Sequence, residues 1–213
     1  MRVMPANHRS LRLQQLALDF PDKIGHLYSP GGFSTVYPMF PFALDNGAFS
    51  AFRNGTPFDE GSFLDLCQRI KGTQIDPFWV VVPDKVGDAV ETKRLWKEWA
   101  PLLRSDYRWP LAFAVQDGMI RQDVPSDADV VFIGGSTEWK WAWVPSWAAW
   151  FPRVHVARVN RPRALEYLEG LGVESCDGTG WFRGDKTQTQ GLLDWVQGIR
   201  RQVWLFSTDE MAG

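Results

Sequence analysis

A regular alternation of short apolar runs with helix-like segments is the feature that most constrains the fold of this chain. The apolar runs, rich in β-branched and aromatic residues, are Ile24–Tyr28, Phe42–Leu44, Phe78–Val82, Leu111–Val115, Val130–Ile133, Val154–Val159 and Val173–Cys176. Segments with apolar residues at helical spacing separate several of them, at Phe58–Ile70, Ala89–Leu103, Trp139–Trp150, Arg163–Leu171 and Gly191–Val203. Strands that alternate with helices are typical of βα units joined in a parallel sheet.

The number of these units predicts the fold class. About seven or eight units in roughly 190 residues favour an α/β protein built as a single compact (β/α)8 barrel of the TIM type. We expect residues 1–213 to form this one domain, with residues 1–20 as a polar N-terminal arm or short helix and Val203–Phe206 as the remaining candidate strand. A doubly wound sheet is the alternative, although Ser29–Gly32 only weakly matches the Gly-rich turn that usually follows its first strand.

The composition is that of a globular protein and not of a polycation. Hydrophobic residues make up 45% of the chain, charged residues 23%, and the formal net charge is −2. Nucleic-acid binding would therefore need a local basic patch. Cys67 and Cys176 match no zinc or redox spacing, and no apolar N-terminal segment or long apolar run is present, so we expect a cytoplasmic protein without a membrane partner.

Polar residues cluster directly after the apolar runs. They are Asp45, Asp84, Gln116, Gly134 and Gly135, Arg158 and Asp177. A turn or helix-cap role explains any one of them alone. In a parallel barrel, however, all of these strand ends lie on one face, which is the face where active sites are built. Six such positions in succession therefore indicate a site.

Two of these residues, Asp45 and Asp177, form a candidate catalytic pair. They are expected at the ends of the second and seventh predicted strands, across or around the mouth of the barrel. Paired carboxylates suit chemistry at a sugar carbon, because one can attack C1′ while the other moves a proton to or from the leaving group. The pair predicts glycosyl transfer or hydrolysis.

Four short motifs occur in order over about 45–183: "LDNGAFSAF", "LAFAVQDGM", "VVFIGGS" and "ESCDGTGWFRGD". They resemble motifs of the guanine transglycosylase superfamily, whose members exchange guanine for a 7-deazaguanine base in tRNA. A branch of that family acts on DNA in bacteria and their phages. The resemblance to that branch implies a pentosyltransferase that replaces guanine in DNA with a free 7-deazaguanine base of the preQ0 type. It also implies a covalent glycosyl-aspartate intermediate and a bacterial or phage-infected host cell.

The same resemblance implies a role for each residue of the site. Asp177 would be the nucleophile that attacks C1′, and Asp45 would be the general acid/base. Asp84 would read the N1/N2 edge of the base. Gln116, together with the backbone N–H of Gly134 or Gly135, would hold the O6 atom of the base. A guanine edge suits this set, since its N–H donors match a carboxylate and its carbonyl matches donors.

Two departures from the family pattern bear on the substrate. The tRNA enzymes carry a Cys-rich zinc site near the C-terminus, whereas the last cysteine here is Cys176 and no Cys/His quartet exists. We therefore expect no zinc, no other metal and no cofactor, and we favour DNA over tRNA. In addition, Asp117 replaces the first glycine of the family's Gln-Gly-Gly motif. The small size of the chain makes a homodimer or a partner subunit plausible.

Candidate nucleic-acid contacts follow the last two predicted strands. Basic residues that could meet phosphates are Arg158, Arg161, Arg163, Arg183 and Lys186, with Arg200 and Arg201 further along. Acidic neighbours make a solvated charged face an equal alternative. A target base in a duplex must be flipped out before C1′ can react. Trp181 is expected to fill the gap that the flipped base leaves.

The densest aromatic segment lies within 136–151. Trp143, Trp147 and Trp150 follow helical spacing and are expected in the core, with Pro145 interrupting their helix, whereas Trp139 or Trp141 is the better candidate for a surface ring. The histidines show no metal-ligand spacing, and we expect His155 to be a satisfied core residue.

Other functions remain open from the sequence. The chain could be a tRNA-guanine transglycosylase, a small-molecule barrel enzyme such as a nucleoside hydrolase or lyase, or a non-catalytic nucleic-acid-binding barrel. Retention of both Asp45 and Asp177 argues against the non-catalytic alternative.

Overall fold

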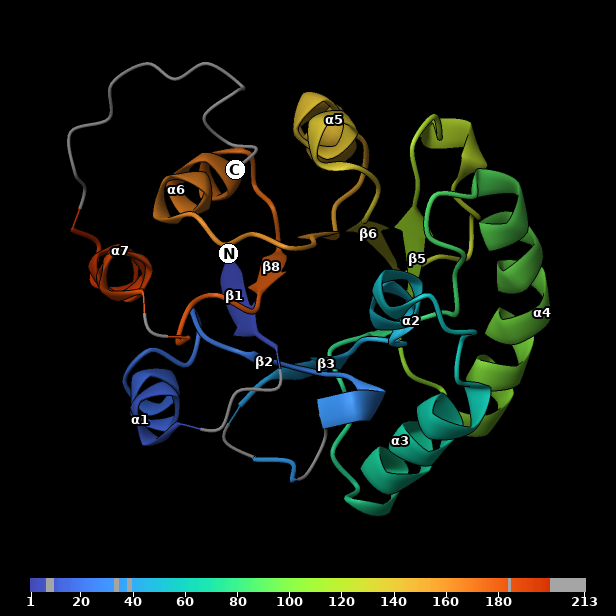
Figure 1. Ribbon diagram of the computed structural model, residues 1–213, viewed down its shortest axis with the longest axis horizontal. Coiled ribbons are helices and arrows are strands. Elements are labelled where there is room, and N and C mark those ends of the chain that lie inside the picture. Colours follow the sequence, from blue (N-terminus) through green and yellow to red (C-terminus); the bar gives the residue numbers. More distant parts are fainter. Residues whose placement is uncertain (7–9, 33–34, 38–39, 184, 200–213) are drawn as a thin grey trace.

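The computed structural model describes residues 1–6, 10–32, 35–37, 40–183 and 185–199, and it is an eight-stranded parallel barrel (Figure 1). The strands are β1 Arg2–Pro5, β2 His26–Tyr28, β3 Phe42–Leu44, β4 Val80–Val81, β5 Leu111–Val115, β6 Val130–Ile133, β7 Val154–Val156 and β8 Ser175–Gly178. The helices are α1 Leu11–Asp19, α2 Ala48–Asn54, α3 Glu60–Gly72, α4 Ala89–Tyr107, α5 Thr137–Trp150, α6 Pro162–Gly170 and α7 Lys186–Val196, with 3-10 turns η1 Pro30–Gly32 and η2 Arg121–Asp123.

The strand order around the sheet is β1-β8-β7-β6-β5-β4-β3-β2, and every pairing is parallel. Two isolated bridges, Val3 to Ile24 and Ala6 to Leu27, join β1 to β2 and bring the ends of the sheet together. Helices surround the strands on the outside (Figure 1). The predicted (β/α)8 barrel is confirmed, and the doubly wound alternative is excluded because such a sheet stays open.

The N-terminal residues correct one prediction. Residues 1–20 were expected to form a polar arm or a short helix, but Arg2–Pro5 is the strand that closes the barrel, and only Leu11–Asp19 is helical. Four residues are too few for a period-two pattern to be visible, although three of the four are buried. Asp45 and Asp177 therefore follow or lie in the third and eighth strands. The alternative eighth strand at Val203–Phe206 lies outside the described residues, as do Arg200 and Arg201.

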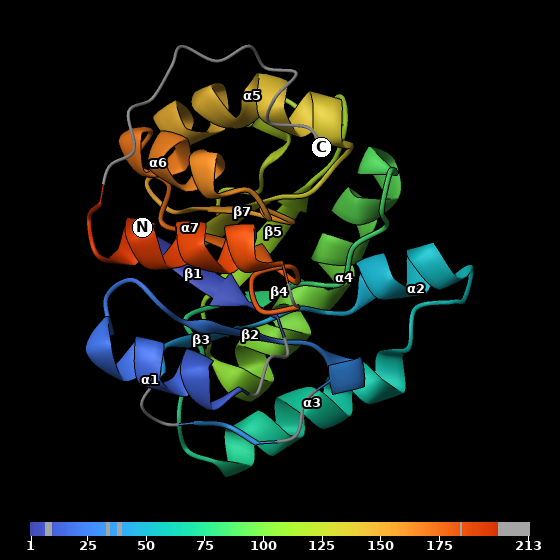
Figure 2. The same ribbon diagram turned by 60° about the vertical axis from the view of Figure 1, so that its left-hand side comes forward.

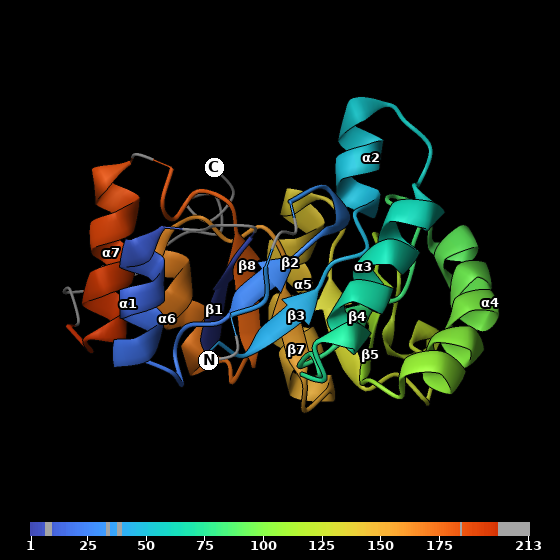
Figure 3. The same ribbon diagram turned by 90° about the horizontal axis from the view of Figure 1, so that it is seen from below.

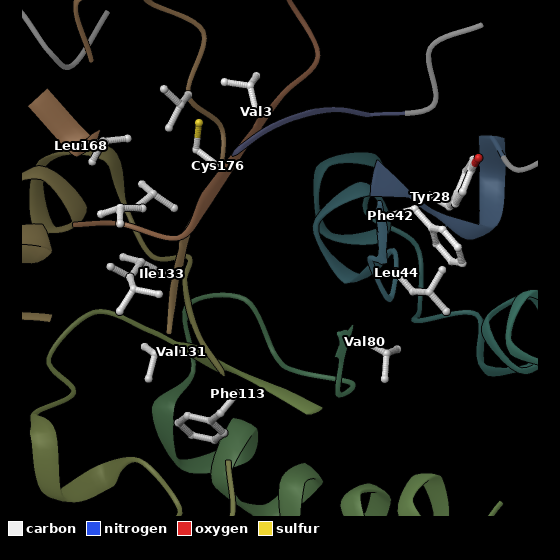
Figure 4. Packing of buried hydrophobic residues seen from close by; sticks show 14 of the residues in the cluster. Val3, Tyr28, Phe42, Leu44, Val80, Phe113, Val131, Ile133, Leu168 and Cys176 are labelled. Carbon is white, nitrogen blue, oxygen red and sulfur yellow. The ribbon is translucent and has the colours of Figure 1, made fainter. Parts of the chain in front are cut away.

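The buried apolar residues form two layers because strand side chains alternate between the two faces of the sheet. One layer fills the barrel interior, with Met4, Leu27, Ala43, Trp79, Val81, Ala112, Ala114 and Val130. The other layer lies between strands and helices. Figure 4 shows part of it, including Phe113, Ile133 and Cys176 from three different strands. The interior layer stops below the strand ends, where polar residues take over.

Several helices of the outer ring begin at side-chain caps. Asp59, Asp88, Ser136 and Asp185 each accept a hydrogen bond from a backbone N–H in the first turn of α3, α4, α5 and α7, respectively. Figure 2 shows these helices standing against the outside of the strands. Among the described residues, no helix combines the length and the apolar character needed to cross a membrane.

Helix α5 corrects the expected placement of its aromatic residues. The helix continues through Pro145, since the fixed φ of proline is compatible with a helix and buried residues on both sides hold the segment against the barrel. Trp147 is fully buried, as expected for a core residue, but Trp143 is 37% exposed. Trp141, an expected surface ring, is buried, and Trp139 is partly buried against the core.

Helix α2 differs from the others in its position. It follows β3 and rises beyond the ends of the strands, whereas the other helices lie alongside them (Figure 3). One side of α2 carries Phe49, Phe52 and Arg53 at helical spacing. Phe52 is 59% exposed.

Replacement of Trp147 by alanine should destabilise the protein by about 3–5 kcal/mol, because the ring fills a fully buried space between α5 and the barrel. Urea denaturation measures this change in the free energy of unfolding. Trp143→Ala in the same helix is the matched control and should cost less than about 1 kcal/mol. Equal costs for the two variants would show that α5 packs differently.

Candidate active site

One pocket lies at the carboxyl ends of the strands, and the predicted site residues gather in its wall. Its empty volume is about 550 Å³, which includes the part open to solvent. The predicted residues that line it are Asp45, Asp84, Gln116, Gly134, Gly135, Arg158 and Asp177. Leu27, Asn46, Phe49, Val81, Val86, Ala114, Phe132 and Ala157 complete the lining. Residues from Leu27 to Asp177, far apart in the chain, thus meet in one place.

The turn after β3 explains how Asp45 remains available to a substrate. Gly47 has φ 86°, a conformation that favours glycine. The side-chain Oδ1 of Asn46 accepts a hydrogen bond of 2.7 Å from the backbone N–H of Ala48, at the start of α2. The backbone N–H groups of Gly47 and Asn46 also interact with the carboxylate of Asp45, so both side chains take part in this turn. The carboxylate of Asp45 is left to face the pocket.

Asp84 is held by two amide side chains. Asn46 Nδ2 donates to Oδ1 of Asp84 at 2.8 Å, and Gln116 Nε2 donates to Oδ2 at 2.8 Å. These amides are themselves fixed, because Asn46 also donates to the carbonyl of Val82 and Gln116 accepts from the N–H of Gly87. Each oxygen of Asp84 keeps a lone pair for another donor. Asn46, which we did not predict as a site residue, orients this carboxylate.

Asp177 is held on one side only. Its Oδ1 accepts hydrogen bonds from the backbone N–H of Arg158 at 3.0 Å and from Nε2 of His155 at 3.1 Å. Oδ2 accepts none from the residues that the structure describes. The side chain is 7% exposed and lines the pocket. One oxygen is thus fixed while the other remains free to act.

His155 is the main residue of the site that the sequence prediction underrated. The expectation of a satisfied core residue is confirmed, since the ring is fully buried and its Nδ1 contacts Ser175 Oγ at 2.9 Å. Its second nitrogen, however, contacts Asp177. When Nε2–H donates to the carboxylate, Nδ1 accepts from the Ser175 hydroxyl. A period-two count along β7 would have placed His155 opposite Val154 and Val156, and therefore inside the barrel.

Three carboxylates in one pocket affect each other's protonation. Burial, together with the negative charges of Asp177 and Asp84, raises the pKa of Asp45 to about 7. Burial also raises the pKa of Asp84 to about 6, although the hydrogen bonds from Asn46 and Gln116 oppose this rise. Asp45 therefore exchanges its proton near neutral pH, which is the property of a general acid/base.

Arg158 lies in the pocket wall. Its guanidinium lies over the ring of Phe49, with 4.6 Å between Cζ and the ring centroid, and donates a hydrogen bond to the carbonyl of Gly135. The backbone has φ 59°, which is unusual for a residue other than glycine. The N–H of this same residue donates to Asp177, so the strained backbone of Arg158 lies at the group that positions that carboxylate.

The two glycines in the loop after β6 have different roles. The N–H of Gly134 donates to the carbonyl of Val115 at 3.3 Å, so it is not available for the O6 atom of a base as predicted. Gly135 has φ 65°, and a Cβ atom there would lie 2.5 Å from Asp117 Oδ1. Asp117 accepts a hydrogen bond of 2.6 Å from the N–H of Ser136 and so fixes this loop. Asp117 therefore has a structural role in this loop.

The prediction that Trp181 fills the gap left by a flipped base is not supported by its position. Its ring is fully buried in the layer between strands and helices, so it is not exposed to fill a duplex. Arg161, Arg183 and Lys186 lie after β7 and β8, outside the pocket lining. Arg161 is partly buried, whereas Arg183 and Lys186 are exposed. Their contacts with phosphates remain predictions.

The chemistry of the pocket follows from these residues. Within the ranges that the structure describes, no group of three or more His, Cys, Asp or Glu side chains is arranged to hold a metal ion. The pocket instead offers a half-fixed carboxylate, a second carboxylate that titrates near neutrality, and a third held by two amides. This arrangement suits nucleophilic and acid/base work on a polar ligand with N–H groups.

Comparison with known proteins does not test the resemblance to the transglycosylases. No protein-family model matches the chain, and no curated protein matches it. The transglycosylase resemblance therefore stays a prediction, based on four short motifs and on the geometry of this pocket.

Asp45→Asn should stabilise the protein by about 1–3 kcal/mol at pH 8 and by nothing at pH 4. The pKa of Asp45 is raised on folding, so the wild type loses stability as pH rises from about 4 through about 7. The asparagine variant does not titrate and lacks this loss. Urea denaturation at several pH values measures the difference, with the exposed Asp106→Asn as control. A gain that does not depend on pH would contradict the assigned environment.

Proposed function

We propose that this protein is a base-exchange transglycosylase that replaces guanine in DNA with a 7-deazaguanine base. The observation that carries the proposal is the placement of Asp45 and Asp177 in one pocket with contrasting surroundings. One carboxylate titrates near neutral pH, and the other is fixed through a single oxygen. These are the properties needed by an acid/base and by a nucleophile, respectively.

In the first step Oδ2 of Asp177 attacks C1′ of the target nucleotide, and the bond between C1′ and N9 of guanine breaks. The electron pair of that bond moves onto the base, which takes a proton from protonated Asp45. A glycosyl-aspartate ester and free guanine result. His155 and the Arg158 N–H hold Oδ1, so the attacking oxygen is presented without rotation of the carboxylate.

In the second step the 7-deazaguanine base replaces guanine in the pocket. Ionised Asp45 removes the proton from N9 of the incoming base, N9 attacks C1′, and the ester bond to Asp177 breaks. One glycosidic bond has replaced another, so the exchange needs no external energy source. Asp45 ends each cycle protonated, as it began, which suits a pKa of about 7.

Recognition of the base rests on Asp84. Its two oxygens are oriented by Asn46 and Gln116 and retain lone pairs for the N1 and N2 donors of a guanine-like edge. The second N–H of the Gln116 amide and the N–H of Gly135 are the candidate donors to O6. Both residues line the pocket beside Asp84.

A polynucleotide substrate must present a flipped or unpaired nucleotide to this pocket. Helix α2 supports that requirement, because Phe49 lines the pocket while Phe52 and Arg53, three and four residues later, lie on the same side of the helix beyond it. Phe52 is thus an exposed ring beside the entrance, in the role once expected of Trp181.

The proposed exchange is tested by offering a radiolabelled 7-deazaguanine with duplex DNA, single-stranded DNA or tRNA and counting label in the polymer. Label should enter DNA. Asp177→Asn should abolish incorporation, and Asp45→Asn should lower kcat by roughly 10²- to 10⁴-fold. Acid-trapped wild-type protein should carry a DNA adduct on Asp177.

The other outcomes separate the alternatives. Label in tRNA alone would preserve the chemistry and change the substrate. Base release from free nucleosides, without incorporation into polymer, would replace the proposal with a nucleoside hydrolase. Asp106→Asn is the control, because Asp106 is exposed on α4 and lies outside the pocket lining. Wild-type incorporation by Asp177→Asn would reject the central assignment.

Phe52→Ala should lower kcat/KM on duplex DNA by about tenfold, since loss of one stacked ring removes roughly 1–3 kcal/mol. Activity on single-stranded DNA, where no gap has to be filled, should change less. Leu102→Ala, an exposed apolar residue on α4, is the matched control. Equal losses on both substrates would contradict a gap-filling role for Phe52.

A further inference from the structure

Lys140 is a buried cation beside the site that the proposed mechanism does not use. It lies on α5, is 1% exposed, and its Nζ donates a hydrogen bond of 2.6 Å to the carbonyl of Ala157. Nζ also lies 5.3 Å from the centroid of the Trp141 ring. A buried lysine costs free energy unless it is well paired. Its position therefore calls for a reason other than packing.

The carbonyl that accepts from Lys140 belongs to the peptide group that holds Asp177. This peptide joins Ala157 to Arg158, and its N–H donates to Oδ1 of Asp177 at 3.0 Å. The two hydrogen bonds lie at opposite ends of one planar group. A positive charge at the carbonyl end polarises the peptide and strengthens the donor at its other end. The residue that follows this carbonyl, Arg158, has the unusual backbone conformation with φ 59°.

We propose that Lys140 is a positioning residue for Asp177, acting through the Ala157–Arg158 peptide. It fixes the direction of the Arg158 N–H and places a positive charge at the carbonyl end of that peptide. Its role as a positioning residue in catalysis rests on the proposed function, whereas its coupling to Asp177 does not. Lys140 does not line the pocket and touches no substrate.

The groups that face Lys140 define its electrostatic setting. They are Arg158 and Asp177 on the barrel side, with Cys176 on the adjoining strand. Burial, reinforced by the charge of Arg158, lowers the pKa of Lys140 to about 8, while Asp177 opposes this shift. Lys140 is therefore charged at neutral pH and loses its proton as pH rises through about 8. The support given to Asp177 should weaken over the same range.

The first experiment compares Lys140→Met and Lys140→Arg with wild type in the exchange assay. Lys140→Met keeps the length of the side chain and removes a buried charge, so the melting temperature should stay within a few degrees. Its kcat should fall roughly tenfold or more, with KM nearly unchanged. Lys140→Arg stays charged, so its ratio of kcat at pH 9 to kcat at pH 7 should exceed that of wild type. Lys97→Met, at an exposed position on α4, is the control.

The second experiment does not depend on activity. NMR titration of ¹³C-labelled lysine measures the pKa of Lys140 in wild type and in Asp177→Asn. Because coupling between two sites is reciprocal, removal of the Asp177 charge should lower the pKa of Lys140 by roughly half a unit to one unit. Lys97 should not shift.

Each result decides between the proposals. An unchanged Lys140 pKa in Asp177→Asn, or wild-type kcat in Lys140→Met, overturns the positioning role. A Lys140→Met variant that loses its melting transition assigns Lys140 a structural role only, unless Lys140→Arg restores both fold and kcat. If wild type exchanges no base, the proposed function fails, and the NMR titration alone still establishes or rejects the coupling of Lys140 to Asp177.

Discussion

Closure of the parallel sheet by β1 is the constraint on which the rest of the structure depends. The order β8-β7-β6-β5-β4-β3-β2 alone would be an open sheet with Asp177 at one edge and Asp45 near the other. Strand β1 pairs with β8 on one side and bridges to β2 on the other. This closure brings two carboxylates from opposite ends of the sheet to one pocket, and it also removes both exposed edges.

The three carboxylates of the pocket differ in the hydrogen bonds that stabilise their negative charge. Asp84 has two amide donors, Asp177 has a backbone donor and His155 on one oxygen, and Asp45 sits beside both negative charges. Burial and repulsion therefore raise the pKa of Asp45 the most, and Asp45 keeps its proton up to near neutral pH. Carboxylates whose surroundings push their protonation apart can perform different steps of one reaction.

Support for Asp177 extends outward through the barrel wall. His155 reaches it from inside the barrel, where its ring contacts those of Trp79 and Phe132. Lys140 reaches it from the helix layer through the Ala157–Arg158 peptide. Both polar side chains are buried. A buried polar group costs free energy unless it forms hydrogen bonds. The hydrogen bonds of His155 and Lys140 therefore stabilise the fold and also position Asp177.

The sequence by itself determined the barrel and the placement of polar residues at its strand ends. The alternation of strand-like and helix-like segments is a local pattern, and in a closed parallel sheet the residues that follow the strands all lie on the same face. Only the tertiary structure decided that Arg2–Pro5 closes the barrel, that Asn46 orients Asp84, and that Trp181 is buried. It also decided that His155 and Lys140 meet Asp177 from two sides. These contacts join strands and helices far apart in the chain, and no local periodicity encodes which side chains will face each other across a closed sheet.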